Sequence, residues 1–295
     1  MPAFDRRCFL GVAAAAAAAR PASAQNKMRL GVIVSAGPDP DASIRRVHDL
    51  GFPTCQVGVR ETSDAAASAL RAALDKYHVE ATSAVFGGPG PEIYDFYQGP
   101  ATIGLVPRQS REARLARIRQ VADFAKKVGI PAIQGHCGFI PENPNEPLYT
   151  EAVEAIRTAA SYARQQGLGF RCETGQETPI TLVRAIRDIG LDNVGINFDV
   201  GNLILYGKAN PVDAVELFAP YIQGVHAKDG LYPTDPKRLG REVPIGEGKV
   251  DFPVLIAKFK KIGYSKPLTI EREISGEKQT TDILAAKAYL EKLIG

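Results

Sequence analysis

The sequence predicts an α/β protein folded as a single-domain (β/α)8 TIM barrel. Short apolar segments alternate with longer segments of helical periodicity, and eight such pairs follow one another between residues 28 and 295. The apolar segments are hydrophobic along most of their length, which is typical of parallel strands covered on both faces. Eight pairs in this length fit a barrel of this kind, for which about 250 residues is typical.

The expected strands are the eight apolar segments, which cover residues 28–34, 54–59, 79–86, 132–137, 168–173, 194–199, 222–227 and 268–272. The expected helices carry apolar residues at helical spacing, and they cover residues 41–50, 63–77, 111–128, 150–166, 179–189, 211–218, 252–262 and 280–293. At five places a glycine stands between a helix and the next strand, where a left-handed residue ends a helix: Gly51, Gly129, Gly167, Gly190 and Gly263.

A doubly wound open sheet is the alternative arrangement of these elements. Its first turn would carry a Gly-x-Gly-x-x-Gly pattern in a dinucleotide-binding protein. Residues 35–38 read Ser-Ala-Gly-Pro instead, which favours the barrel. Two long loops, 87–110 and 228–250, follow strands, so we expect them at the C-terminal face of the barrel as lids or binding loops.

Residues 1–24 are expected to be an export leader, followed by the barrel over residues 25–295. Arg6 and Arg7 belong to a segment that resembles the twin-arginine export motif, and an apolar run over residues 8–19 and an Ala-Ser-Ala cleavage site follow. The pattern predicts a periplasmic protein of a bacterium; an alanine-rich N-terminal helix is the alternative. The apolar run is shorter than the about 20 residues that cross a bilayer, so no membrane span is expected.

The charge balance argues against a nucleic-acid partner. The chain has 36 Lys and Arg residues against 33 Asp and Glu residues, and three of the basic and one of the acidic residues lie in the leader. The remaining 33 basic and 32 acidic residues nearly cancel, whereas a surface that binds phosphate groups is basic.

Four successive expected strands each end in a side chain that can bind a metal, namely Glu173, Asp199, His226 and Glu271. Barrel active sites are built at the carboxyl ends of the strands, so these side chains are expected to converge. Three neighbouring carboxylates repel one another, and a cation is the simplest way to stabilise them. Oxygen donors with one imidazole suit one divalent metal ion: Mn²⁺, Mg²⁺, Co²⁺ or Zn²⁺.

The segments around these residues resemble a known family. They read Glu-Thr-Gly-Gln-Glu-Thr at 173–178, Ile-Asn-Phe-Asp-Val-Gly-Asn at 196–202, Val-His-Ala-Lys-Asp-Gly at 225–230, Ile-Gly-Glu-Gly-Lys-Val-Asp-Phe-Pro at 245–253 and Leu-Thr-Ile-Glu-Arg-Glu at 268–273. Together they are similar to the sugar phosphate isomerase/epimerase family of xylose-isomerase-like TIM barrels. The resemblance covers essentially the whole chain after the leader.

This resemblance implies that Glu173, Asp199, His226 and Glu271 are the metal ligands. In the ketose epimerases of the family, the glutamates that correspond to Glu173 and Glu271 also act as an acid/base pair on opposite faces of the substrate. The implied reaction removes a proton beside a metal-polarised carbonyl and returns a proton to the resulting enediolate.

Three positions depart from the epimerase pattern. Asn202, Pro179 and Tyr232 stand where the ketose epimerases carry a substrate-contacting histidine, a second glutamate and an arginine. The residues that grip the substrate are therefore expected to differ, and ketose 3-epimerisation as such is not carried over.

Four polar residues near the expected strand ends are candidates for substrate binding: His136, Gln176, Asn202 and Lys228. For His136, the alternative is a structural hydrogen bond. For Lys228, which shares a strand face with His226, it is a salt bridge to Asp229 or Glu271.

Other residues carry weaker signals. Glu177, Arg241 and Glu247 lie in segments that follow strands and are weaker candidates for substrate contact. The aromatic residues of the first long loop, Tyr94, Phe96 and Tyr97, form either a sugar-stacking wall or a loop anchor. His48 and His78 are expected to be surface or packing residues.

The leading functional hypothesis is a divalent-metal-dependent sugar isomerase or epimerase acting through an enediolate on an unphosphorylated small carbohydrate. Export favours such a substrate, because sugar phosphates are mostly cytoplasmic. The alternative is a metal-dependent lyase or dehydratase that eliminates a β-substituent from a keto-sugar or 3-keto-glycoside. A non-catalytic periplasmic sugar-binding protein is less favoured, and so is a three-zinc DNA-repair endonuclease, because the chain has only four histidines.

Overall fold

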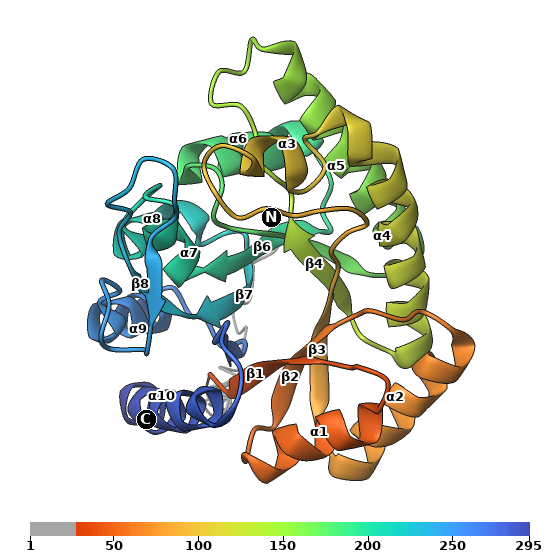
Figure 1. The fold of residues 1–295 in the computed structure, drawn as a ribbon, viewed down its shortest axis with the longest axis vertical. Coiled ribbons are helices and arrows are strands. Elements are labelled where there is room, and N and C mark those ends of the chain that lie inside the picture. Colours follow the sequence, from red (N-terminus) through yellow and green to blue (C-terminus); the bar gives the residue numbers. More distant parts are fainter. Residues whose placement is uncertain (1–27) are drawn as a thin grey trace, which may run out of the picture.

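The computed structural model describes residues 28–295 and shows a closed barrel of parallel strands surrounded by helices (Figure 1). The barrel strands are β1 (Leu30–Ser35), β2 (Thr54–Gly58), β3 (Glu80–Val85), β4 (Ala132–His136), β5 (Gly169–Glu173), β6 (Val194–Asp199), β7 (Ile222–Ala227) and β10 (Leu268–Ile270). Their order around the barrel is β1-β10-β7-β6-β5-β4-β3-β2. The predicted (β/α)8 TIM barrel is therefore confirmed, whereas the expected leader lies outside the described residues.

The expected helices form the outer layer of the barrel. They are α1 (Pro40–Asp49), α2 (Asp64–Tyr77), α4 (Arg108–Val128), α5 (Pro147–Gln165), α6 (Pro179–Ile189), α8 (Pro211–Phe218), α9 (Phe252–Lys261) and α10 (Glu277–Ile294). The starts of α4, α5 and α10 were each expected three residues too late. The first turns of α4 and α10 are polar and carry no apolar periodicity, and α5 begins at a proline, which suits the first helical position.

The glycines expected to end helices all have a positive φ. At Gly129, for example, φ is 87°, and its N–H group donates a hydrogen bond of 2.9 Å to the carbonyl of Ala125. This left-handed residue closes the last turn of α4 and turns the chain towards β4.

Short elements inside the connections were not predicted. They are α3 (Gly99–Thr102), α7 (Val200–Leu205) and an antiparallel pair formed by β8 (Asp229–Leu231) and β9 (Arg241–Val243). These elements are too short for hydrophobic periodicity to reveal. The buried helix α7 follows β6 directly, and the carboxylate of Asp199 caps it by accepting a hydrogen bond of 2.7 Å from the N–H of Asn202.

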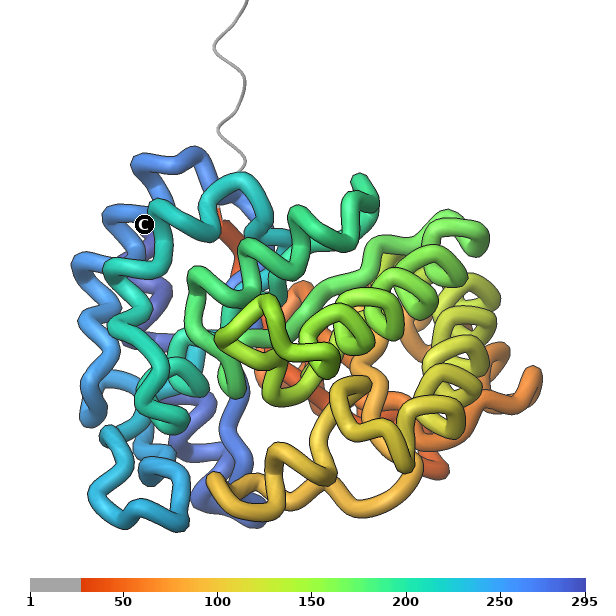
Figure 2. Tube along the Cα trace, turned by 90° about the horizontal axis from the view of Figure 1, so that it is seen from above, coloured from red at the N-terminus to blue at the C-terminus, as the bar shows by residue number. Residues whose placement is uncertain are grey.

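The two long loops meet each other at one end of the barrel. The N–H group of Phe96 donates a hydrogen bond of 3.2 Å to the carbonyl of Lys237, and Asp95 forms an isolated bridge with Arg238. Figure 2 shows the segment after β3, in yellow, and the segment after β7, in blue, along the same side of the molecule.

The apolar core lies between the barrel and its helices. Phe198 on β6 packs edge-on against Phe218 and Phe259, with ring centroids 5.2 Å and 6.1 Å away. Full burial of such a side chain contributes about 1.5–3 kcal/mol. Because successive side chains of a strand alternate between its faces, Asn197 and Asp199 point into the barrel when Phe198 points outward.

Candidate metal centre and active site

The carboxyl ends of four neighbouring strands bring Glu173, Asp199, His226 and Glu271 together. Glu173 and Asp199 end β5 and β6, His226 lies beside Asp199 in the strand register, and Glu271 directly follows β10. One possible ligand atom of each residue lies within 4.8 Å of the others. The Nδ1 atom of His226 lies 3.2 Å from Glu173 Oε1, 3.4 Å from Asp199 Oδ2 and 3.1 Å from Glu271 Oε2.

This group of side chains, the metal-ligand group, has the chemistry to hold one divalent cation. Asp199 Oδ2 and His226 Nδ1 are buried and form no hydrogen bond with any part of the described chain, although buried polar atoms are normally paired. Carboxylate oxygens and an imidazole nitrogen are ligands that Mg²⁺, Mn²⁺, Co²⁺ and Zn²⁺ accept in different proportions. The four residues therefore could bind a metal, while the choice of ion stays open.

The charges of the group shift one another's pKa values. Burial opposes the ionised form of Glu271, but Lys228 and His226 outweigh it and hold the pKa of Glu271 well below its usual range. Burial also opposes the charged form of His226, but Glu271 and Glu173 outweigh it and hold the pKa of His226 well above its usual range. Burial raises the pKa of Asp199 to about 7. A metal at Nδ1 would replace a proton, so metal affinity is coupled to pH.

Lys228 is a buried cation beside the metal-ligand group. Its side chain is 2% exposed, and its Nζ atom lies 3.2 Å from Glu271 Oε2, 3.0 Å from Glu273 Oε2 and 3.7 Å from Asp199 Oδ2. Of the two salt-bridge partners considered from the sequence, the structure selects Glu271. The ammonium group therefore balances part of the negative charge of the group.

Asp229 binds backbone N–H groups of the second long loop and does not pair with its neighbour Lys228. Its Oδ1 accepts hydrogen bonds from the N–H groups of Gly230 and Val250, at 2.8 Å and 3.1 Å. Its Oδ2 accepts from Gly246 and Gly248, at 2.9 Å and 3.0 Å. One buried carboxylate therefore holds the returning end of the second long loop against the end of β7.

His136 and Gln176 lie together on the β5 side of the group. The Nε2 atom of Gln176 lies 3.1 Å from His136 Nδ1 and 3.0 Å from the hydroxyl of Tyr206. When Gln176 donates to Nδ1, the proton of a neutral His136 lies on Nε2, which is 3.8 Å from Glu173 Oε1. The ring of Tyr94 stands edge-on to His136, with centroids 5.8 Å apart.

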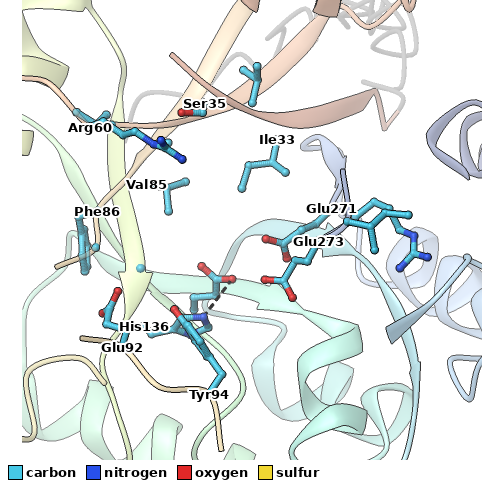
Figure 3. A pocket seen from close by; sticks show the side chains of 18 of the residues that line it. Ile33, Ser35, Arg60, Val85, Phe86, Glu92, Tyr94, His136, Glu271 and Glu273 are labelled. Carbon is cyan, nitrogen blue, oxygen red and sulfur yellow. Dashed lines mark ion pairs between the residues drawn. The ribbon is translucent and has the colours of Figure 1, made fainter. Parts of the chain in front are cut away.

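A cavity of 460 Å³ opens beside the metal-ligand group (Figure 3). Its wall includes both Glu173 and Glu271, together with His136, Tyr94 and Glu273. In Figure 3 the side chains of Glu271 and Glu273 reach the cavity from one side, and those of His136 and Tyr94 from another. Two carboxylates that belong both to a possible metal site and to the cavity wall can exchange protons with a bound molecule.

The chain belongs to a known family. Residues 44–293 match the family described as xylose isomerase-like TIM barrel. This chain is a member of the xylose isomerase-like TIM barrel family. The expected family resemblance is thereby confirmed for the barrel.

Individual proteins show graded similarity to this chain. The chain is 31% identical over 196 residues to the uncharacterized protein MJ1311 of Methanocaldococcus jannaschii, covering 61% of this chain and 64% of that protein. It is 25% identical over 205 residues to the L-ribulose-5-phosphate 3-epimerase UlaE of Salmonella paratyphi C, covering 55% of this chain and 70% of that enzyme.

Solved structures extend this similarity to the fold. A xylose isomerase domain protein from Planctomyces limnophilus is 35% identical with a TM-score of 0.85, covering 90% of this chain and 97% of that chain. A xylose isomerase-like protein from Mycobacterium smegmatis in complex with magnesium is 19% identical with a TM-score of 0.67, covering 90% of this chain and 96% of that chain. The second comparison shows a shared fold.

Among the helices of residues 28–295, none combines the length and apolar character of a membrane span.

Three of the residues predicted to bind substrate lie outside the cavity wall. Gln176 and Lys228 make the contacts described above, and the side-chain amide of Asn202 donates a hydrogen bond of 3.3 Å to the carbonyl of Thr174. Of the four candidates, His136 alone is among the residues that line this cavity. The structure therefore places His136 in the cavity wall, and substrate contact by all four stays a prediction.

The weaker candidates are scattered. Arg241 and Glu247 are exposed on and after β9, whereas Glu177 is buried and burial raises its pKa to about 8. Phe96 packs edge-on to Tyr206 at 6.5 Å, and Tyr97 is exposed. The two histidines expected to be surface residues, His48 and His78, are exposed.

A layer of polar side chains inside the barrel, on the inner side of the metal-ligand group, was not predicted from the sequence. Gln56, Ser83, Gln134 and Asn197 are all buried there. Glu273, which pairs with Lys228, was also not singled out. The signal for the buried layer was present, since each of its residues interrupts an apolar strand.

Proposed function

We propose that this protein is a metal-dependent sugar isomerase or epimerase that works through an enediolate. The observation that carries the proposal is that Glu173 and Glu271 belong to the metal-ligand group and also line the cavity. The sequence similarity to an L-ribulose-5-phosphate 3-epimerase supports the same class of reaction.

The metal, held by Glu173, Asp199, His226 and Glu271, would polarise a sugar carbonyl and acidify the adjacent C–H bond. The pKa values of Glu173 and Glu271 lie below their usual range, because charged neighbours outweigh burial, so both carboxylates are available as bases at neutral pH. One glutamate accepts the proton from the sugar carbon, leaving the electron pair in the enediolate.

Return of the proton decides the product. Delivery by the second glutamate to the opposite face of the same carbon gives an epimer, and delivery to the neighbouring carbon gives an isomer. Lys228 stabilises the ionised form of Glu271 from 3.2 Å. The Nε2–H group of His136 points towards the Glu173 side of the cavity, where it can donate a hydrogen bond to a sugar oxygen.

The substrate we propose is an unphosphorylated carbohydrate. Within the described residues, the cavity wall has four carboxylates and two guanidinium groups: Glu92, Glu173, Glu271, Glu273, Arg60 and Arg272. Arg272 is already paired with Glu242 and Asp282 at 2.9 Å each. With the metal balancing Glu173 and Glu271, the wall has no excess of positive charge that would bind a phosphate group, which favours a neutral sugar over a phosphorylated one. The twin-arginine pattern of residues 1–24 supports export to the periplasm, where such a sugar would be met.

Loss of a β-substituent after the same proton abstraction would make the protein a lyase, so the test must separate the two outcomes. The protein is stripped with a chelator, reloaded in turn with Mn²⁺, Mg²⁺, Co²⁺ and Zn²⁺, and incubated in D₂O with free sugars and 3-keto-glycosides. We expect metal-dependent deuterium incorporation into recovered sugar. An unsaturated product or a released aglycone would identify a lyase instead.

Two substitutions test the proposed acid/base pair. Glu173→Gln and Glu271→Gln should each abolish deuterium incorporation, whereas Glu216→Gln, a change at an exposed side chain, should not. Full activity in both cavity variants would overturn the assignment of the pair. Failure of every divalent ion to raise the melting temperature would overturn the metal dependence.

A further inference from the structure

A directional chain of hydrogen bonds runs through the barrel interior to the back of His226. Ser83 Oγ donates to Gln134 Oε1 at 2.5 Å, and Gln134 Nε2 donates to Gln56 Oε1 at 2.7 Å. Gln56 Oε1 lies 2.5 Å from His226 Nε2. The chain joins β3, β4, β2 and β7. The first three are adjacent strands of the barrel, whereas β7 is adjacent to none of them, so the chain crosses the barrel interior. All of its side chains are fully buried.

The polarity of this chain is set where two nitrogen atoms converge on one oxygen. The Nε2 atoms of Gln134 and His226 both lie within hydrogen-bond distance of Gln56 Oε1, so Gln134 turns its amide nitrogen to Gln56 and its oxygen to the Ser83 hydroxyl, which donates to it. Gln56 then presents its oxygen to Gln134 and its nitrogen to Asn197, whose Oδ1 lies 3.3 Å away. With its oxygen in that place, Gln56 accepts a hydrogen bond from the Nε2–H group of His226.

The tautomer of His226 decides whether it can bind a metal. A metal binds the neutral ring, in which a proton on Nε2 leaves the Nδ1 lone pair free, and Nδ1 is the atom that faces the three carboxylates. The opposite tautomer is also within reach, because Gln134 Nε2 lies 3.1 Å from His226 Nε2 and could donate to it. In that tautomer the Nδ1 proton would block the metal position.

Gly224, two residues before His226 on β7, makes room for this arrangement. A Cβ atom at this position would lie 2.7 Å from Asn197 Oδ1 and 3.6 Å from Gln56 Nε2. The first distance is shorter than atoms of this kind tolerate. The lack of a side chain at this position of β7 therefore leaves Asn197 Oδ1 where it can accept a hydrogen bond from Gln56 Nε2.

We propose that Gln56 is a positioning residue whose amide oxygen holds His226 in the metal-binding tautomer, with Gln134 and Ser83 fixing the orientation of that amide. The inference rests on the metal-dependent function proposed above. It extends that function to a residue of β2 that contributes no atom to the metal-ligand group.

The test compares two substitutions of Gln56 by titration of the chelator-stripped protein with Mn²⁺. Gln56→Leu removes the acceptor and should weaken Mn²⁺ binding about 10–100-fold, the usual effect of losing the partner of a ligating histidine. Gln56→Glu keeps an acceptor oxygen and should bind Mn²⁺ within a few-fold of the parent protein. Equal loss in both variants, or no loss in Gln56→Leu, would overturn the proposal.

Two further variants separate the loss of the Gln56 acceptor from a general loss of packing. Thr269 is buried beside His226 in the β7–β10 register, and its hydroxyl has no partner among residues 28–295, so Thr269→Val should leave Mn²⁺ affinity unchanged. Gln134→Leu should show a smaller loss than Gln56→Leu. If Thr269→Val weakens binding as much as Gln56→Leu, the effect belongs to barrel packing and the proposal is wrong.

Nitrogen-15 NMR of the histidine side chains separates this inference from the proposed function. In the parent protein the Nε2 proton of His226 should exchange slowly with solvent, and in Gln56→Leu it should exchange fast. This pattern supports the positioning role even if the parent protein binds no divalent ion, an outcome that would overturn the metal-dependent function alone. Fast exchange in the parent protein would overturn the positioning role.

Discussion

The ammonium nitrogen of Lys228 lies 3.2 Å from Oε2 of Glu271, in a pair whose side chains are 2% and 11% exposed. A charge removed from water in this way is stable only while its partner is present. Glu271 lines the cavity and belongs to the metal-ligand group, so the pair links the stability of the barrel mouth to the proposed chemistry.

Replacement of Lys228 should therefore affect both stability and pH dependence. In Lys228→Met the buried carboxylates lose their cation, which should cost about 3–5 kcal/mol of the free energy of unfolding in urea. The pKa of Glu271 should rise, because Lys228 is the strongest charge that lowers it, and the acidic limb of the activity profile should move to higher pH. Lys258→Met, at a half-exposed pair with Glu216, should change stability by no more than about 1 kcal/mol. Equal effects of the two changes would contradict this account.

Asp229 should be sensitive even to a change that preserves its shape. In Asp229→Asn one oxygen becomes an NH₂ group that faces backbone N–H donors, and each donor left unpaired should cost about 1–3 kcal/mol in urea unfolding. Asp251→Asn is the matched control: Asp251 caps α9 by accepting from the N–H of Val254 at 3.2 Å, and asparagine caps a helix equally well. A loss confined to Asp251→Asn would show that the Asp229 bonds do not hold the loop.

Metal binding should strengthen with rising pH. The raised pKa of His226 means that its proton stabilises the fold below the usual value of about 6.5, and that this contribution is lost as pH rises through the raised pKa. Asp199, with a pKa of about 7, must also lose its proton to bind a metal. We expect the increase in melting temperature on adding Mn²⁺ to grow from about pH 6 to about pH 8.5. The chelated protein, melted over the same range, supplies the baseline, and a constant increase would contradict the expectation.

His136 should matter for the substrate and not for the metal. His136→Ala removes a polar group of the cavity wall, and the loss of one hydrogen bond to a substrate should lower kcat/KM about 10–100-fold. Mn²⁺ affinity should stay unchanged, and His48→Ala, at an exposed histidine of α1, should change neither quantity. A parallel loss of Mn²⁺ affinity would place His136 among the metal ligands instead.

Gly224→Ala should weaken metal binding at His226 indirectly, through Asn197 and Gln56. The added Cβ crowds Asn197 Oδ1 and should cost about 1–3 kcal/mol of stability, with weaker Mn²⁺ binding. Gly169→Ala on β5 is the control, because a Cβ there meets its nearest neighbour, the Cβ of Ala132, at an ordinary 3.4 Å. Unchanged Mn²⁺ affinity in Gly224→Ala would show that the amide chain adapts to the extra atom.

Much of the barrel was predictable because each long element carries its own periodic signal. The eight strands and eight outer helices follow from that signal, and so do the strand ends that carry Glu173, Asp199 and His226. The short helix α7 and the β8–β9 pair carry no such signal, because three to six residues are too few for a period to show. Gln176 follows β5 and Asn202 lies on α7, and their hydrogen-bond partners depend on how the loop after β5 packs against α7.

The sequence by itself determined that four side chains able to bind a metal would stand at neighbouring strand ends, since strand order and the alternation of side chains follow from the repeated pattern. Only the tertiary structure decided which groups these side chains meet. Gln56 reaches His226 across 170 positions of the chain, because closure of the barrel lets side chains of β2 and β7 meet in its interior. Lys228 pairs with Glu271 rather than Asp229, because the carboxylate of Asp229 is already saturated by N–H groups of a loop that returns about twenty residues later.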